Sequence, residues 1–138
     1  MDDFSYHRPK DVEEAVSLYQ SADDPMYLSG GMTLIPTMKQ RLAEPTDVID
    51  LSGLRELTGV KSLKDRLSIG AFTRHNDVAN HEAIQAKLPV LSKLASGIGD
   101  NQVRNRGTIG GSIANSDPAA DYPAAVVGLG ATIITQKR

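Results

Sequence analysis

Two segments of the sequence combine adjacent glycines with hydroxyl-bearing residues, a pattern that suits the binding of phosphate groups. The first segment is Ser29-Gly30-Gly31-Met32-Thr33-Leu34. Glycine permits a positive φ and lets a ligand approach the backbone, and the start of a following helix offers unpaired N–H groups. These features favour an anion site, such as one for a pyrophosphate. Glycines at this place can also serve turn geometry alone, and that alternative stays open.

The second segment is Gly107-Thr108-Ile109-Gly110-Gly111-Ser112. A tight turn with exposed N–H groups, flanked by the hydroxyls of Thr108 and Ser112, again suits phosphate oxygens. A glycine pair in a hairpin or bulge is the structural alternative. Two such segments in one small chain could close on a pyrophosphate from two sides, in a cleft between two small subdomains.

Charged residues near the second segment could complete such a site. Asp121 precedes an alanine-rich stretch and is either a helix N-cap or an acceptor for sugar hydroxyls. Arg104 and Arg106 would share one face of an extended segment, where they could neutralise a pyrophosphate or pair with a protein partner. An ordinary pair of surface arginines is the default interpretation.

Composition excludes several other functions. The chain of 138 residues has no cysteine, which excludes disulfides, a thiolate nucleophile and an iron–sulfur cluster held by this chain. The formal charge of −2 argues against nucleic-acid binding, and the three scattered histidines do not suit a metal site. Neither G-x-G-x-x-G nor a Walker A motif is present, no Ser/His/Asp arrangement can be singled out, and no carboxylate pair has an identifiable catalytic context. We therefore expect no catalytic residue, and instead a binding module for a cofactor with its own reactivity.

Hydrophobic patterns predict the elements that must position these residues. In the first part we expect a helix capped by Asp11, a short buried strand at 26–28, a helix at 33–42 and a strand at 48–51, which together favour a small parallel sheet. In the second part we first expect a hairpin turning at 64–66, a short helix capped by Thr73 or Asn76 and ending at Ile84, and a helix from Pro89. Loops or short strands should follow at 101–122. The last expected elements are a helix at 123–129 and a strand at 131–135.

The stretch from Gln102 to Pro123 resembles the signature of the FAD-binding subunits of molybdenum hydroxylases, of the aerobic carbon monoxide dehydrogenase or xanthine dehydrogenase type. The opening Tyr6-His7-Arg8-Pro9, the segment Ser29–Leu34 and the stretches 49–51 and 69–73 look like the same family. The resemblance covers nearly the whole chain, although relatives commonly carry a polar pair where Met32-Thr33 stands and an Asn at position 112.

The resemblance implies an α+β, PCMH-type FAD-binding fold. A small, mainly parallel three-stranded sheet with helices would form a first subdomain at 1–54. A mixed sheet with helices would form a second at 55–138, incomplete at its C-terminus because family members are longer. Residues 29–34 and 108–112 would hold the FAD pyrophosphate, Asn115 would shape the adjoining loop, and Asp121 would contact the sugar-alcohol part of the flavin nucleotide.

The resemblance also implies the setting of the protein. FAD would receive electrons from an iron–sulfur small subunit with 2Fe-2S clusters, supplied by a large subunit with the molybdenum cofactor, and would pass them to an external acceptor. No apolar run approaches the ~20 residues of a membrane span and the N-terminus is no secretory signal. We therefore expect a cytoplasmic oxidoreductase subunit, inactive alone, and leave peripheral membrane association open. A truncated assembly module without flavin and an unrelated ADP-type nucleotide-binding domain are the alternatives.

Overall fold

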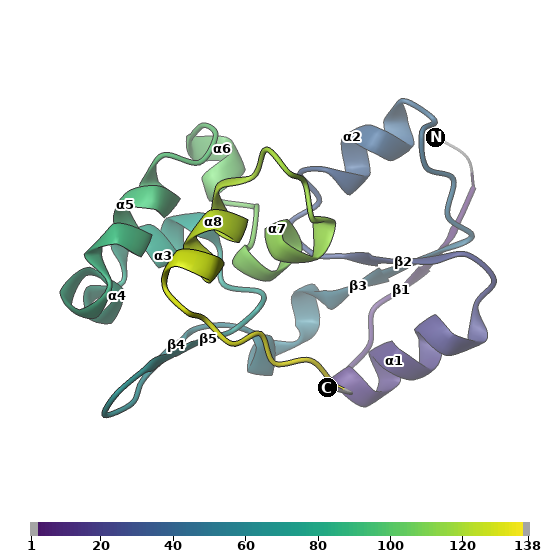
Figure 1. Cartoon of the computed structure of the whole chain (residues 1–138). Coiled ribbons are helices and arrows are strands. Elements are labelled where there is room, and N and C mark those ends of the chain that lie inside the picture. Colours follow the sequence, from purple (N-terminus) through teal and green to yellow (C-terminus); the bar gives the residue numbers. More distant parts are fainter. Residues whose placement is uncertain (1–2, 137–138) are drawn as a thin grey trace.

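The computed structural model describes residues 3–136, and its first part is built on a three-stranded parallel sheet (Figure 1). The strands lie in the order β1-β3-β2, with bounds β1 Ser5–His7, β2 Pro25–Leu28 and β3 Asp47–Asp50. Both neighbours pair in parallel with β3, Tyr6 opposite Val48 on one side and Met26 opposite Val48 on the other. The expectation of a small parallel sheet is confirmed, although β1 had no strong sequence signal of its own.

Two helices lie on opposite sides of this sheet, α1 (Val12–Ser21) and α2 (Leu34–Lys39) (Figure 1). Asp11 caps α1 as expected, because its side chain accepts a hydrogen bond from the Glu14 N–H at 2.8 Å. Two short 3-10 turns, η1 (Leu51–Gly53) and η2 (Arg55–Leu57), follow β3. Strand β2 is less buried than expected, since Tyr27 is exposed.

The second part is mainly helical. Within residues 3–136 its strands form the antiparallel hairpin of β4 (Val60–Ser62) and β5 (Leu67–Ile69), where a mixed sheet had been expected. The helices are α3 (His75–Asn80), α4 (Glu82–Lys87), α5 (Pro89–Ser96), α6 (Asn101–Arg104), α7 (Ile109–Asn115) and α8 (Asp121–Gly128). The described residues contain no helix long and apolar enough to cross a membrane. The helices and the two small sheets together confirm the expected α+β class.

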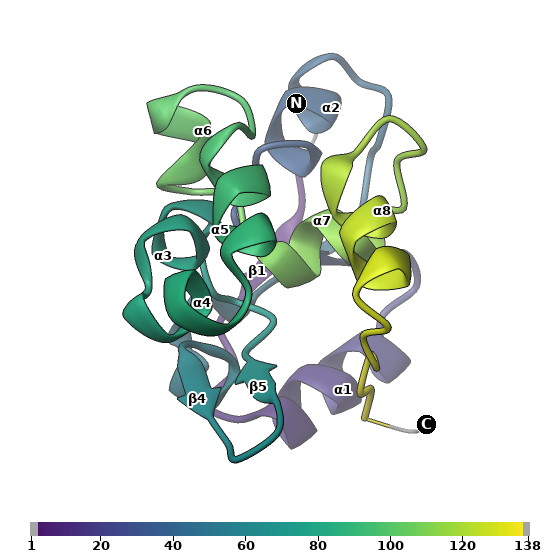
Figure 2. The same ribbon diagram turned by 60° about the vertical axis from the view of Figure 1, so that its left-hand side comes forward.

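Each part has its own hydrophobic cluster. The cluster of the first part contains Ala15, Ile49 and Leu54. The cluster of the second part lies among α3, α4, α5 and α8, and its buried members are Val78, Ala79, Ile84, Leu91, Ala95 and Tyr122. Figure 2 shows this helical group beside the sheet, with α7 between the sheet and α8. Two clusters agree with the expected division near residue 54, but the boundary itself stays a prediction.

Three predicted elements differ from the structure. The stretch 101–122, expected as loops or short strands, forms helices α6 and α7 and the start of α8. The side chains of Asp100 and Thr108 cap α6 and α7, although the polar composition of the stretch does not suggest helices. Neither expected cap of α3 is correct: Arg74 precedes the helix, and the Thr73 hydroxyl bonds Gly59 instead. The predicted strand at 131–135 is irregular in the structure.

Candidate functional site

The first glycine segment follows β2 at the carboxyl edge of the parallel sheet. Gly31 has a φ of 74°, which turns the chain from the strand into α2. Within the part of the chain that the structure describes, the N–H groups of Gly31, Met32, Thr33 and Leu34 have no protein acceptor. Four adjacent free donors at the start of a helix are suited to an anion, as the sequence predicted.

The second glycine segment is built differently, because the N–H groups of Gly107 and of 109–112 are already bonded. Ile109 donates to the Thr73 carbonyl at 3.0 Å, and Gly110 donates to the Ala71 carbonyl at 2.8 Å. The Gly111 N–H donates to Thr108 Oγ1 at 3.1 Å, which caps α7, and Ser112 donates to the Thr108 carbonyl. The expectation of exposed N–H donors in this segment is therefore wrong: these donors hold the fold together.

The glycines of both segments permit close packing between chain segments. A Cβ on Gly110 would lie 2.5 Å from the Ala71 Cβ, and a Cβ on Gly30 would lie 2.2 Å from the Arg106 carbonyl oxygen. Real Cβ atoms do not approach other atoms so closely. The structure thus places Gly30 directly against Arg106, and the two glycine segments lie side by side as the sequence suggested.

Asn115 and Asp121 stand on either side of an exposed turn. Asn115 is the last residue of α7 and Asp121 is the first residue of α8. Ala120, not Asp121, occupies the N-cap position of α8, which corrects the capping alternative for Asp121. Both side chains are exposed, and neither has a hydrogen-bond partner within residues 3–136. Both therefore remain available to a ligand.

A buried pair behind Asp121 fixes the start of α8. Tyr122 is fully buried, and its hydroxyl lies 3.2 Å from Nδ1 of His75, which is 5% exposed. Burial raises the pKa of Tyr122, as does the nearby charge of Asp121, and burial lowers the pKa of His75. Because the His75 N–H also donates to the Gly107 carbonyl at 3.0 Å, one residue ties α3 to both α8 and the second glycine segment.

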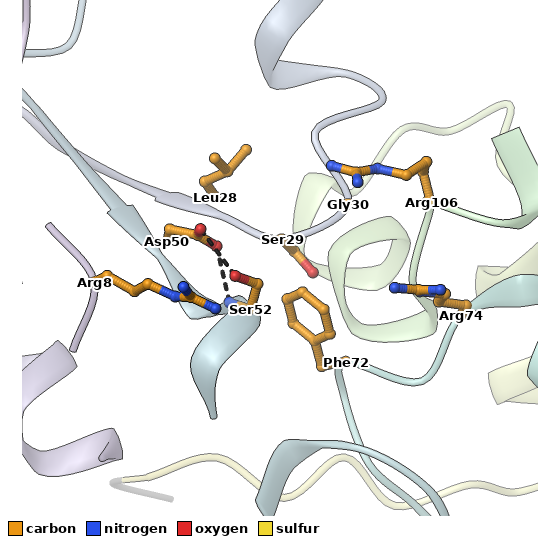
Figure 3. A pocket seen from close by; sticks show the side chains of 9 residues that line it. All are labelled: Arg8, Leu28, Ser29, Gly30, Asp50, Ser52, Phe72, Arg74 and Arg106. Carbon is orange, nitrogen blue, oxygen red and sulfur yellow. Dashed lines mark hydrogen bonds between the residues drawn. The ribbon is translucent and has the colours of Figure 1, made fainter. Parts of the chain in front are cut away.

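A pocket of about 270 Å³ opens where the two parts meet (Figure 3). Its lining is mostly polar and comes from the ends of all three strands and from the second part: Arg8, Leu28, Ser29, Gly30, Asp50, Ser52, Phe72, Arg74 and Arg106. The sequence had singled out Arg106 but neither Arg8 nor Arg74. A signal existed for Arg8, which directly follows β1, but only once that short strand is recognised.

Arg104 and Arg106 do not share a face, contrary to the interpretation of this stretch as extended. Arg104 is the last residue of α6, and its guanidinium donates to the carbonyls of Ile98 and Gly99 at 3.2 and 2.9 Å. Arg106 instead lines the pocket. The helical turn between them separates a structural arginine from one that is available to a ligand.

The fold and the site together define an α+β protein suited to hold a phosphate-bearing nucleotide. A family model described as the FAD binding domain in molybdopterin dehydrogenase matches residues 2–138, and the chain belongs to that family. The resemblance noted in the sequence is thereby confirmed.

Two similar relatives are medium chains of dehydrogenases. The glyceraldehyde dehydrogenase medium chain of Sulfolobus acidocaldarius is 42% identical over 96% of this chain and 47% of its own length. The carbon monoxide dehydrogenase medium chain of Hydrogenophaga pseudoflava is 43% identical over the same shares of the two chains. The chain thus spans about half the length of these relatives.

Solved structures of related enzymes also resemble this chain over about half of their own length. Carbon monoxide dehydrogenase from Hydrogenophaga pseudoflava lacking the Mo-pyranopterin moiety of the molybdenum cofactor matches with a TM-score of 0.89 and 46% identity, over 91% of this chain and 44% of the other. Quinoline 2-oxidoreductase from Pseudomonas putida 86 matches with a TM-score of 0.81 and 31% identity, over 84% and 41% of the two chains. Both likenesses support the α+β fold class.

Proposed function

We propose that this chain binds the phosphate groups of FAD in the flavoprotein subunit of a molybdenum-containing hydroxylase or dehydrogenase. The observation that carries the proposal is the row of free N–H groups from Gly31 to Leu34, at the carboxyl edge of a parallel sheet in a chain of the FAD-binding family. Bound FAD would supply the redox chemistry, taking electrons from iron–sulfur clusters and passing them to an external acceptor.

The proposed cofactor contacts are those predicted from the sequence, with different roles for the two glycine segments. In the first, backbone N–H groups would hold the pyrophosphate; in the second, the backbone braces the fold, and side chains would contribute. The residues are Ser29, Gly30, Gly31, Met32, Thr33, Leu34, Thr108, Ile109, Gly110, Gly111, Ser112, Asn115 and Asp121. The division into subdomains at 1–54 and 55–138 is part of the same proposal, and the two separate hydrophobic clusters support it.

The residues present fit a nucleotide pyrophosphate on physical grounds. The first segment offers four unpaired donors, and three arginines line the adjoining pocket. Asp121 would be repelled by phosphate but suits hydroxyl groups, because an ionised carboxylate accepts hydrogen bonds and donates none. Donors at one end and an acceptor at the other match a ligand that joins a pyrophosphate to a polyol.

By the same proposal, the protein works beside an iron–sulfur small subunit and a molybdenum large subunit in the cytoplasm. Medium chains among the relatives, such as that of the Hydrogenophaga pseudoflava carbon monoxide dehydrogenase, support this setting. The substrate of such a complex would be chosen by the molybdenum subunit, so the residues of this chain would position FAD and not substrate.

Titration with FAD, ADP and riboflavin tests the proposal. We expect FAD to bind saturably and to raise the melting temperature, since a ligand that binds only the folded state stabilises it. Riboflavin lacks the phosphates and should bind at least tenfold more weakly. Absence of saturable FAD binding would overturn the proposal, and it would favour an assembly module without flavin. Equal stabilisation by ADP and FAD would favour an ADP-type site instead.

A further inference from the structure

Three arginines from distant segments converge on the pocket between the two parts of the chain, which we call the arginine pocket. Arg8 follows β1, Arg74 precedes α3, and Arg106 precedes the second glycine segment. Figure 3 shows Arg8 on one side and Arg74 and Arg106 on the other, with their guanidinium groups directed toward the space between. Within residues 3–136, none of the three guanidinium groups has a hydrogen-bond or ion-pair partner.

One carboxylate in the pocket does not balance this charge. Asp50 accepts hydrogen bonds from Tyr6 Oη, from the Ser52 N–H and from Ser52 Oγ. Burial alone would raise the pKa of Asp50, but these hydrogen bonds and the charge of Arg8 outweigh it and lower the pKa. Asp50 is therefore ionised and already bonded, and three guanidinium groups face a single carboxylate.

The pocket also has the size and polarity of an anion site. Its volume of about 270 Å³ is enough for a phosphate or pyrophosphate and small for a drug-sized apolar ligand. Guanidinium forks match phosphate oxygens in a bidentate manner, and Ser29 Oγ and the Gly30 backbone border the same space. Three like charges held around a small pocket repel each other, and a dianion between them removes that repulsion.

We propose that the arginine pocket binds a phosphoryl group through Arg8, Arg74 and Arg106. The group could come from the pyrophosphate of the proposed FAD or from a separate phosphate-bearing molecule, because both present the same dianionic oxygens. The pocket shares Ser29 and Gly30 with the proposed flavin site, but the proposal rests on the three arginines, so phosphate binding is tested separately from FAD binding.

Titration with inorganic phosphate and with pyrophosphate tests the pocket, at constant ionic strength with chloride as the balancing anion. Isothermal titration calorimetry should show saturable binding of one anion per chain. Arg8→Gln, Arg74→Gln and Arg106→Gln should each weaken it about tenfold, the usual scale for a charge-assisted hydrogen bond. Arg74→Lys, which keeps the charge but loses the fork, should give an intermediate loss.

Arg66→Gln is the matched control, because it removes the same charge from the exposed hairpin turn and should leave phosphate affinity unchanged. Circular dichroism of each variant without ligand confirms that it is folded. The proposal is overturned if phosphate binding does not saturate, if the pocket variants behave like Arg66→Gln, or if succinate binds as tightly as phosphate, which would indicate a carboxylate site.

Competition with FAD then identifies the source of the phosphoryl group. Stoichiometric displacement of phosphate by FAD assigns the pocket to the FAD pyrophosphate, whereas simultaneous binding assigns it to a separate molecule. Phosphate binding without FAD binding would refute the flavin function and leave the pocket in place. FAD binding without phosphate binding would refute the phosphoryl site in the arginine pocket and leave the flavin function in place.

Discussion

Ser29 Oγ and Thr108 Oγ1 lie 2.7 Å apart, which joins the two glycine segments by a hydrogen bond between residues 79 positions apart in the chain. Thr108 is 2% exposed and also caps α7 through the Gly111 N–H. A single threonine therefore holds both the contact between the two parts and the start of the helix that carries the second segment.

Replacement of these hydroxyls should separate the two roles of Thr108. Ser29→Ala removes only the bond between segments and should cost about 1 kcal/mol of unfolding free energy. Thr108→Val also removes the helix cap and buries an unpaired Gly111 N–H, so we expect a loss of about 2–3 kcal/mol. Urea denaturation of both single variants and the double variant measures the coupling. Equal losses in the two single variants would contradict the double role of Thr108.

Two glycines in short helices should respond oppositely to alanine. A Cβ on Gly110 would lie 2.5 Å from Ala71, so Gly110→Ala should cost about 1–3 kcal/mol through overpacking. A Cβ on Gly128 in α8 would meet nothing within 4 Å, so Gly128→Ala should stabilise by about 0.4–1 kcal/mol. Melting temperatures without ligand check both values. Gly110→Val, with a larger side chain, should likewise damage the fold before it blocks any ligand.

Stability should fall in mild acid because of His75. Burial lowers the pKa of this imidazole from 6.5 in the folded state, so between 6.5 and the lower folded pKa the unfolded chain binds the extra proton. The unfolding free energy is then fully retained above pH 6.5 and decreases as pH falls through that window. His75→Gln should flatten this part of a pH series of urea melts. The lowered pKa of Asp50 acts below its usual 3.8, where stability also decreases as this carboxylate is protonated.

The bond between His75 and Tyr122 should position Asp121 as well as stabilise the fold. Tyr122→Phe keeps the ring in the core but leaves His75 Nδ1 without its partner, at a cost of about 1–3 kcal/mol. If Asp121 holds the polyol of FAD, this variant should weaken FAD binding more than ADP binding. Equal effects on the two ligands would show a purely structural role.

The irregular segment after α8 should tolerate polar substitution. Ile134 is 86% exposed, so Ile134→Ser should change the unfolding free energy by less than about 0.5 kcal/mol. Ile84 is fully buried, and Ile84→Ala should cost about 2–5 kcal/mol. A large loss from Ile134→Ser in urea denaturation would show that this segment packs in solution.

Local chemistry let the sequence predict several elements by itself. Asp11 and the apolar stripe that follows it define α1, and the turn at 64–66 defines the hairpin, because caps and turns act over a few residues. The stretch from Gln102 to Pro123 identified the family for a similar reason: residue types in a fixed order are readable without coordinates. The same stretch misled the assignment of helices, because its glycines and polar residues disfavour helix until Asp100 and Thr108 cap it.

Only the tertiary structure decided which donors are available to a ligand. Both glycine segments look alike in sequence, yet the carbonyls of Thr73 and Ala71, 36 and 39 positions earlier, accept the N–H groups of Ile109 and Gly110. Nothing in the chain does so for Gly31 to Leu34 within the described residues. Arg8 follows β1, whereas Arg74 and Arg106 belong to the second part, so the three line one pocket only because the second part packs against this edge of the sheet. Residue types therefore set which chemistry the chain can offer, and long-range packing determines where that chemistry remains free.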